Sequence, residues 1–219
     1  VPLGTAGGIY PALMGSIYLG ALSALIGGLL GIGAAIYLVF YGTGKRCSIL
    51  VNMAVTGLSG IPSILFGLVG YTLLIYRFGL GRSLLCSALC VAAMIIPFVA
   101  IRAKKILEEK GREYMKNSLS LGLSREYALR KLILPTCFVE LLGTVALGMA
   151  YGMGAVAPIL YTGAVMQADV PHSLSDPFMS LPYHLYILVN NGFSLDYAYG
   201  TAFVLMLFIN VVTLLIAEV

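Results

Sequence analysis

The chain has 219 residues, of which 60% are hydrophobic and only 10% are charged, and its formal net charge is +4 at pH 7. Soluble domains carry about 25% charged residues, so this composition excludes a water-soluble protein and predicts one integral membrane domain over residues 1–219. The basic residues flank apolar runs, as they do in cytoplasmic loops, so the positive charge does not indicate nucleic-acid binding.

Five apolar runs along the chain are long enough to cross a membrane, because a spanning helix needs about 20 apolar residues. A basic turn with Lys45 and Arg46 follows the first run, and a turn with Arg77 and Arg82 follows the second. A polar stretch separates the third run from the fourth. The runs cover residues 12–41, 49–76, 83–101, 132–165 and 197–217. We therefore expect an all-α membrane protein with about five transmembrane helices.

The polar stretch, residues 102–135, decides the predicted orientation. Residues 102–131 and the first turn together hold eleven Lys and Arg residues, whereas the opposite side holds two, so residues 102–131 are expected to be cytoplasmic. Residues 166–196 then form an extracytoplasmic loop, in which residues 180–193 suit a short interfacial helix. The chain begins at Val1 and ends within an apolar run. We expect a fragment, with a further span before residue 1.

Polar groups inside the predicted spans are few. Glu140 is the only acid there, and it either pairs with a nearby Lys or Arg at the interface or lines a translocation path. In the second run, Gly60 and Pro62 predict a broken helix, which would place Ser59 and Ser63 beside one cavity. The alternative is ordinary helix packing, with both hydroxyls bonded to the preceding turn.

Two features of these runs raise other chemistry. Residues 57–60 (GLSG) resemble the GxSG motif of rhomboid-type intramembrane serine proteases, which need a His in a later span to activate the Ser. The two histidines, His172 and His184, both lie in the predicted outer loop, so a protease is a distant alternative. Cys86 and Cys90 would share a helix face, but no His or acid accompanies them, so we expect packing residues and no metal site.

The polar stretch has the signals of a helix, a turn and a second helix. Residues 103–121 suit a helix, with Gly122 in the left-handed conformation after its end. Ser124 suits the N-cap of the next helix. Leu119, Leu121 and Leu123 would give the turn an apolar surface on which a partner can dock.

The residues around this turn resemble a known family. Gly122, followed by Leu123-Ser124-Arg125 and later by Leu134-Pro135, is similar to the second half of the EAA loop of bacterial ATP-binding-cassette (ABC) importer permeases. Further segments resemble the PstA-type permeases of phosphate importers. They are residues 7–12 (GGIYPA), 60–67 (GIPSILFG), 157–163 (APILYTG), 181–186 (LPYHLY) and 199–202 (YGTA).

This resemblance implies a six-span type I importer fold whose first span precedes residue 1, in a multi-pass permease subunit of the bacterial plasma (inner) membrane. The partners it implies are a second permease, two copies of an ATPase subunit and an extracytoplasmic solute-binding protein. ATP and Mg would bind to the ATPase, so the permease itself would be no enzyme and need no cofactor. The residues that it implies for docking onto the ATPase are Gly122, Leu123, Ser124, Arg125 and Pro135.

Two departures from the family's pattern bear on the function. Residues 116–118 (KNS) stand where the family has Glu-Ala-Ala, and Tyr151 and Ala155 stand where phosphate permeases usually carry Arg and Glu. Phosphate therefore follows from the overall likeness, with another oxyanion or a different small solute as the alternative, and a passive channel as a third interpretation. The residues that we expect to line the path are Ser59, Ser63, Thr144 and Tyr151.

Overall fold

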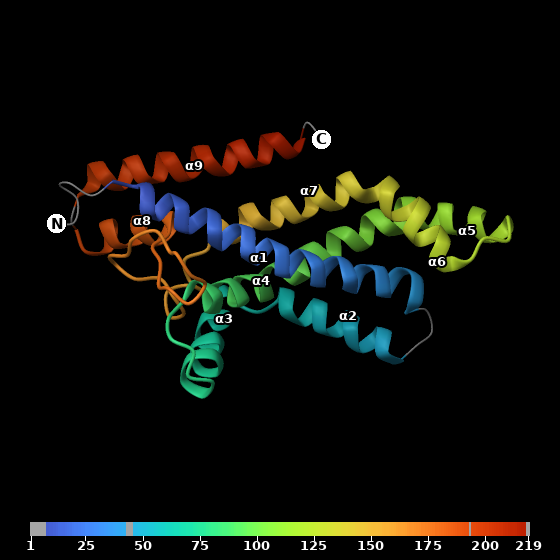
Figure 1. The fold of residues 1–219 in the computed structure, drawn as a ribbon, viewed down its shortest axis with the longest axis horizontal. Coiled ribbons are helices and arrows are strands. Elements are labelled where there is room, and N and C mark those ends of the chain that lie inside the picture. Colours follow the sequence, from blue (N-terminus) through green and yellow to red (C-terminus); the bar gives the residue numbers. More distant parts are fainter. Residues whose placement is uncertain (1–7, 43–45, 193, 218–219) are drawn as a thin grey trace.

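The computed structural model describes residues 8–42, 46–192 and 194–217. Lys45 and the first residue of the 7–12 motif lie outside the described residues. The regular elements of the described part are helices, several of them continued by π-helical stretches labelled η (Figure 1). In chain order they are α1 (Tyr10–Ile36), η1 (Tyr37–Tyr41), α2 (Arg46–Ser59), α3 (Ser63–Gly70), η2 (Tyr71–Arg77), α4 (Leu84–Ile106), η3 (Leu107–Gly111), α5 (Arg112–Ser120), α6 (Arg125–Ala128), η4 (Leu129–Ile133), α7 (Leu134–Met153), α8 (Leu181–Asn190) and α9 (Leu195–Ala217).

Within the described residues, four helical segments are long and apolar enough to cross a membrane: Tyr10–Tyr41, Leu84–Ser120, Arg125–Met153 and Leu195–Leu214. The pair Arg46–Ser59 and Ser63–Arg77 also qualifies, but the chain bends by 104° between its two helices. The expected all-α membrane protein with about five spans is therefore confirmed if the bent pair counts as one span. Run 49–76 is broken as predicted, because Pro62 has no N–H to continue the helical hydrogen bonds.

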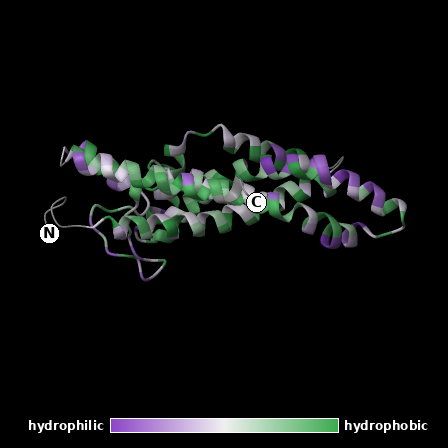
Figure 2. Cartoon of the chain, turned by 90° about the horizontal axis from the view of Figure 1, so that it is seen from above, coloured by the Kyte–Doolittle hydropathy of each residue, from purple (hydrophilic) through white to green (hydrophobic). Residues whose placement is uncertain are grey.

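The centre of the fold is a bundle of α1, α4 and α7, which lie side by side (Figure 1). Hydrophobic residues predominate along the middle of the molecule (Figure 2). Glycines let these helices approach closely, as is common in membranes. A Cβ on Gly28 of α1 would lie 2.8 Å from Cγ1 of Val145 in α7. A Cβ on Gly148 of α7 would lie 2.9 Å from Cγ2 of Ile95 in α4. Larger side chains at these positions would force the bundle apart.

The predicted fourth run, residues 132–165, is wrong beyond Met153, where α7 ends. Residues 154–163 form turns that fold back against α3 and α4. Pro158 lies close to Gly67 of α3, and the Thr162 and Ser87 hydroxyls form a buried hydrogen bond of 2.9 Å. Hydropathy misled the prediction because a segment buried inside the protein is as apolar as one that faces lipid.

The predicted outer loop, residues 166–196, contains the short helix that the sequence predicts. This helix is α8, and Ser180 caps it by accepting a hydrogen bond from the Tyr183 backbone. Four of its side chains are buried, so it is packed into the fold and is not a loose lid; they are Leu181, Pro182, Ile187 and Leu188. α9 begins immediately after the loop and packs against α8 and α7.

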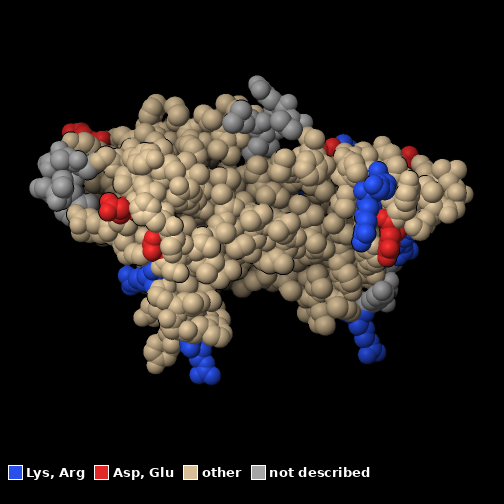
Figure 3. Space-filling model, viewed as in Figure 1, with Lys and Arg blue, Asp and Glu red and all other residues tan. Residues whose placement is uncertain are grey.

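At the opposite end, the helix expected over residues 103–121 is present up to Ser120, and it continues the preceding span. α4 passes through η3 into α5 without a break, as segment Leu84–Ser120. The chain then turns and returns through α6 and η4 into α7. Figure 3 shows that many of the Lys and Arg side chains gather at this end, together with acidic ones. We call α5, the turn and α6 the α5–α6 hairpin.

Candidate functional site

The turn of the α5–α6 hairpin has the geometry that the sequence predicts. Gly122 has a φ of 78°, in the left-handed region that favours glycine. Its N–H donates to the Leu119 carbonyl at 3.0 Å, and the Leu123 N–H donates to the Ser118 carbonyl at 3.1 Å. These bonds satisfy carbonyls at the end of α5. The Ser124 hydroxyl accepts a hydrogen bond from the Tyr127 backbone and caps α6.

The tip of the hairpin presents apolar side chains to the surroundings. Leu121 is 81% exposed and Leu119 is 44% exposed, while Leu123 is partly buried. Exposed leucines at a rigid turn form a small surface on which another protein can dock. The expected apolar docking surface is therefore present for two of the three leucines.

Two of the predicted docking residues lie away from this tip. Arg125 donates a hydrogen bond of 3.0 Å from Nη1 to the Phe40 carbonyl, at the end of the α1–η1 helix. Pro135 lies exposed in the first turn of α7, where it lines a shallow hollow of about 400 Å³ with Arg130, Leu134 and Phe138. The structure thus gives Arg125 a partner inside the chain.

A buried core joins the hairpin to the spans. Phe40 from η1 and Ile133 from η4 close around Gly111, where a Cβ would lie 2.9 Å from the Phe40 ring. The core therefore makes the hairpin an extension of the bundle rather than a mobile loop. Its buried side chains are Ala35, Val39, Phe40, Ala103, Leu107, Met115, Ala128, Leu129, Ile133, Cys137 and Leu141.

One edge of the helix pair formed by α4–η3 and α7 carries a second set of polar and aromatic residues. Lys110 forms an ion pair with Glu140, which confirms the expected partner for the lone acid of the spans. One end of this edge has the Phe98 and Tyr151 rings stacked at 5.6 Å. Thr144 lies between these two contacts and donates to the Glu140 carbonyl. Thr144 and Tyr151, two of the predicted path residues, thus lie on one face of α7.

Arg102 belongs to the same edge and was counted in the sequence only for its effect on orientation. Its guanidinium lies 4.9 Å from the centroid of the Phe98 ring. Arg102 is exposed and forms no ion pair with any acidic residue that the structure describes. Tyr151 stands where the family usually has Arg, and Phe98 of α4 contacts both the Tyr151 ring and the Arg102 guanidinium. The spacing of Phe98 and Arg102, one helical turn apart, was the signal available in the sequence.

Ser59 and Ser63 do not join this edge. They lie at the bend between α2 and α3, which pack chiefly on α4 and on the turns after α7. The Ser59 hydroxyl donates to the Thr56 carbonyl at 2.7 Å, as in the packing alternative. His184 is bonded to Thr201, so the Ser–His pair that a protease needs is not formed by these residues.

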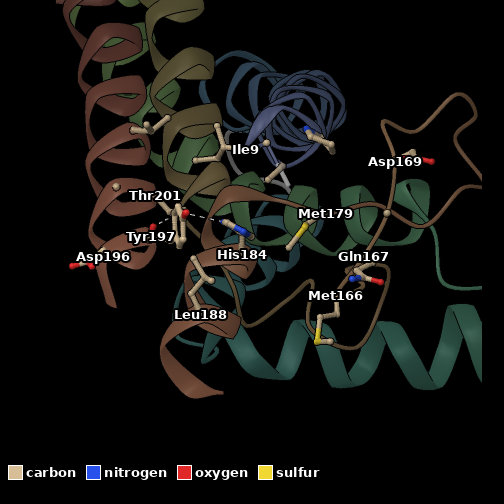
Figure 4. Close-up of a pocket in the computed structure, with 16 residues that line it drawn as sticks. Ile9, Met166, Gln167, Asp169, Met179, His184, Leu188, Asp196, Tyr197 and Thr201 are labelled. Carbon is tan, nitrogen blue, oxygen red and sulfur yellow. Dashed lines mark hydrogen bonds between the residues drawn. The ribbon is translucent and has the colours of Figure 1, made fainter. Parts of the chain in front are cut away.

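At the α8 end, the structure has a cavity of about 670 Å³ (Figure 4). It lies between the first turn of α1, α8, α9 and residues 166–169. His184 Nδ1 lies 3.1 Å from the Thr201 hydroxyl, which in turn donates to the Tyr197 carbonyl at 2.8 Å. Burial lowers the pKa of His184 below its usual range. Among the described residues, no group of three or more His, Cys, Asp or Glu is arranged to hold a metal.

Comparison with known proteins gives sequence relatives and structural neighbours, although no protein-family model matches the chain. The chain is 33% identical to the phosphate transport system permease protein PstA 2 of Mycobacterium bovis, over 94% of this chain and 69% of that protein. It is 28% identical to the probable phosphate transport system permease protein PstA of Methanocaldococcus jannaschii, over 92% of this chain and 72% of that protein.

Two solved structures share the fold. One is the MetNI methionine ABC transporter, with a TM-score of 0.76 at 14% identity, over 96% of this chain and 92% of that chain. The other is an amino acid ABC transporter, with a TM-score of 0.72 at 16% identity, over 96% of this chain and 91% of that chain. The arrangement of helices described above is therefore that of a membrane subunit of ABC transporters.

Proposed function

Since the chain belongs to the PstA family of phosphate transport system permeases, we propose that it forms part of the translocation path for inorganic phosphate, along the exposed edge of the α4–α7 pair that carries Arg102 and Tyr151. It is a permease subunit of an ABC importer and a multi-pass protein of the bacterial inner membrane. It is not an enzyme, because ATP hydrolysis belongs to the partner ATPases in such importers.

Arg102 is the observation that carries the proposed path. Arg102 is the first residue after the third apolar run, so it lies at the cytoplasmic end of the proposed path, where its side chain is exposed. Arg102 has no carboxylate partner in the described chain, and its guanidinium lies over the Phe98 ring, which also stacks with Tyr151. A guanidinium binds oxyanions through two parallel hydrogen bonds. Tyr151 is exposed on α7 and adds a hydroxyl that can donate to a phosphate oxygen, whereas Thr144 is buried and its hydroxyl donates to the Glu140 carbonyl.

The α5–α6 hairpin is the proposed contact with the ATPase. Under this proposal residues 102–131 are cytoplasmic and residues 166–196 are extracytoplasmic. Leu119 and Leu121 would dock in the ATPase, and Gly122, Leu123 and Ser124 would fix the turn that presents them. Arg125 and Pro135 would support the hairpin from its base. The buried core beneath the hairpin supports this role, because movement of a docked hairpin would move α1, α4 and α7 with it.

The exposed apolar surface of α2 and α3 suggests where the second permease binds. ABC importer permeases work with a second permease, ATPases and a binding protein. We place the second permease against the bent α2–α3 pair, where large apolar side chains are exposed, and Ser59 and Ser63 would lie close to that contact. Two ATPase copies would hold the ATP and Mg. The exposed apolar side chains of this pair include Leu50, Met53, Ile64, Leu65, Leu68 and Val69.

Uptake of labelled phosphate into vesicles that hold the full complex tests this function. We expect ATP-dependent uptake, and we expect Arg102→Ala to reduce it by roughly tenfold, because one charge-assisted anion contact is lost. The matched control is Lys105→Ala, since Lys105 lies on the same helix in an exposed pair with Glu109. Equal rates for wild type and Arg102→Ala would refute the proposed path. Equal competition by sulfate or molybdate would instead favour a transporter of another oxyanion.

A deletion of residues 119–126 separates an importer from a passive channel. An importer loses ATP-driven uptake when the ATPase contact is removed, whereas a channel keeps its flux. Uptake that persists without ATP in this variant would overturn the importer function.

A further inference from the structure

The cavity at the α8 end has no part in the path proposed above. It is the larger of the two hollows described, at about 670 Å³, and it lies where the outer ends of α1 and α9 meet α8 and residues 166–169 (Figure 4). Its apolar lining includes Ile9, Met166, Met179 and Leu188. The cavity can therefore accept a chain of carbon atoms if its polar groups match the ligand.

The hydrogen bonds of His184 fix the state of its ring. The Thr201 hydroxyl has one hydrogen, and it is donated to the Tyr197 carbonyl, because a carbonyl can only accept. The contact between Thr201 and Nδ1 then requires that Nδ1 of His184 carries the hydrogen and donates it. In the neutral ring, Nε2 is left with a lone pair. No described residue donates a hydrogen bond to this atom, so it can accept one from a ligand.

The charge of the lining selects the kind of ligand. Asp169 and Asp196 lie on opposite sides of the cavity (Figure 4), and its lining includes no Lys or Arg among the described residues. Both acids are exposed, so they make the rim negative without a pairing cation. An anion such as phosphate would be repelled there, whereas a cation with a donor N–H would be attracted. Lysine and arginine side chains combine such a charged head with an apolar stem.

We propose that this cavity receives a Lys or Arg side chain of the binding protein that docks on the extracytoplasmic face. The stem would lie against Met166, Met179 and Leu188, and the charged head would lie between His184 Nε2 and the acidic rim. This inference rests on the proposed function for the existence and side of that partner. A protein is the fitting source of the cation because the lining includes the 166–169 segment and the exposed acids, which lie at the water-facing end of the spans.

Protonation of His184 would oppose this binding. The other titratable groups that line the cavity are Asp169 from the loop, and Asp196 and Tyr197 from α9. A proton on Nε2 removes the acceptor and adds a positive charge beside the incoming cation. Docking is therefore expected to weaken as the pH falls, and a variant that replaces His184 but keeps both acids separates this effect from that of the acidic rim.

The test measures the affinity of the cognate phosphate-binding protein for the full permease–ATPase complex in nanodiscs. We expect the double variant Asp169→Asn/Asp196→Asn to bind roughly tenfold more weakly at pH 7.5, because a charged contact is lost. Wild type should lose affinity between pH 7.5 and pH 5.5, and His184→Asn should lose that pH dependence. Glu113→Gln, the same kind of change on the hairpin at the other end, is the control and should leave affinity unchanged.

The outcomes also separate this inference from the proposed function. Unchanged affinity in the double variant overturns the cavity proposal, even where phosphate uptake at saturating binding protein is normal. The proposal is also overturned if the double variant loses co-purified phosphatidylethanolamine while its affinity for the binding protein is unchanged, because the cavity would then hold a lipid. Wild-type complex that binds the partner but takes up no phosphate leaves docking intact and refutes the proposed function instead. Basal ATP hydrolysis of each variant shows whether it has folded and assembled.

Discussion

The guanidinium of Arg125 donates a hydrogen bond of 3.0 Å to the Phe40 carbonyl, and this contact ties the start of α6 to the end of the α1–η1 helix. The last carbonyls of a helix lack partners within it and carry partial negative charge. The Arg125 side chain, from the hairpin, donates a hydrogen bond to one of these carbonyls. The residue that the family resemblance assigns to ATPase docking therefore fixes the angle of the hairpin against the first span.

Replacing Arg125 by Ala should loosen the hairpin. The hydrogen bond is partly exposed, so we expect a cost of about 1 kcal/mol in stability and a fall in ATP-driven phosphate uptake with the complex still assembled. Uptake and ATP hydrolysis measured together in vesicles check this. The control is Arg112→Ala, which removes only an exposed pair with Glu108 on the same hairpin. If both variants lose the same amount of coupling, the Arg125 contact has no special role.

Replacing Gly122 by Ala should strain the turn at the tip. A φ of 78° costs a residue with a Cβ about 1 kcal/mol or more. We expect a lower melting temperature and weaker binding of the ATPase. Gly57→Ala is the matched control, because Gly57 lies within α2 and an added Cβ there meets nothing within 4 Å. A Gly122→Ala variant that is as stable as this control would contradict the assigned turn.

The Lys110–Glu140 pair should contribute little to stability, but the two side chains should interact with each other measurably. Both side chains are partly exposed and screened by solvent, so we expect only a small coupling energy. A double-mutant cycle of Lys110→Met and Glu140→Gln, followed by thermal unfolding in detergent, measures it. The reversed pair Lys110→Glu/Glu140→Lys should recover part of the loss. Strictly additive single effects would show that the two groups do not interact.

Gly148→Val should disturb the contact between α7 and α4. The added side chain would meet Ile95 and Val99 at 2.9 and 3.1 Å, and overpacking of this kind costs about 1–3 kcal/mol. The melting temperature of the purified protein checks this value. Gly33→Ala in α1, where an added Cβ meets nothing within 4 Å, is the control. A neutral result at Gly148 would mean that the two helices can separate freely.

Stability at the α8 end should depend on pH through His184. Burial lowers its pKa in the folded state, so between that value and the unfolded pKa of about 6.5 the unfolded state binds more protons. The contribution of neutral His184 is therefore present above pH 6.5 and is lost as the pH falls through the folded pKa. Thermal unfolding between pH 7.5 and 5 should show this loss, and His184→Asn should reduce it. His172→Asn, in the exposed loop, should leave the pH profile unchanged.

Local signals in the sequence predicted the α5–α6 hairpin well. Gly122 and Ser124 act on their own backbone neighbours, so the turn and the cap depend on few residues outside the segment. Glu140 was also informative, because an acid in a span needs a nearby cation, and Lys110 supplies one. The break at Pro62 was also predictable, because proline disrupts the helix at its own position. The angle between α2 and α3 was not predictable from these residues.

Contacts between distant segments were not predictable in the same way. Arg102 meets Tyr151 only through Phe98, and that stack depends on how α4 and α7 align. The cavity around His184 needs three helices and a loop at once. Ser59 was assigned to the path from its neighbours alone, yet its hydroxyl is bonded to Thr56 within its own helix. Hydropathy likewise could not separate the turns after Met153 from a span.

The unbroken helix from Leu84 to Ser120 has a mechanical consequence. Its 37 residues extend over about 55 Å, and Ser120 lies about 27 Å from Arg102 along the same axis. An ATPase bound to the tip would therefore act on the same continuous helix that carries Arg102, the proposed anion-binding residue. Movement of the tip by the ATPase would then displace Arg102 by the same rigid-body motion and so change the affinity for the anion. Flexible residues introduced in η3 should uncouple the two ends.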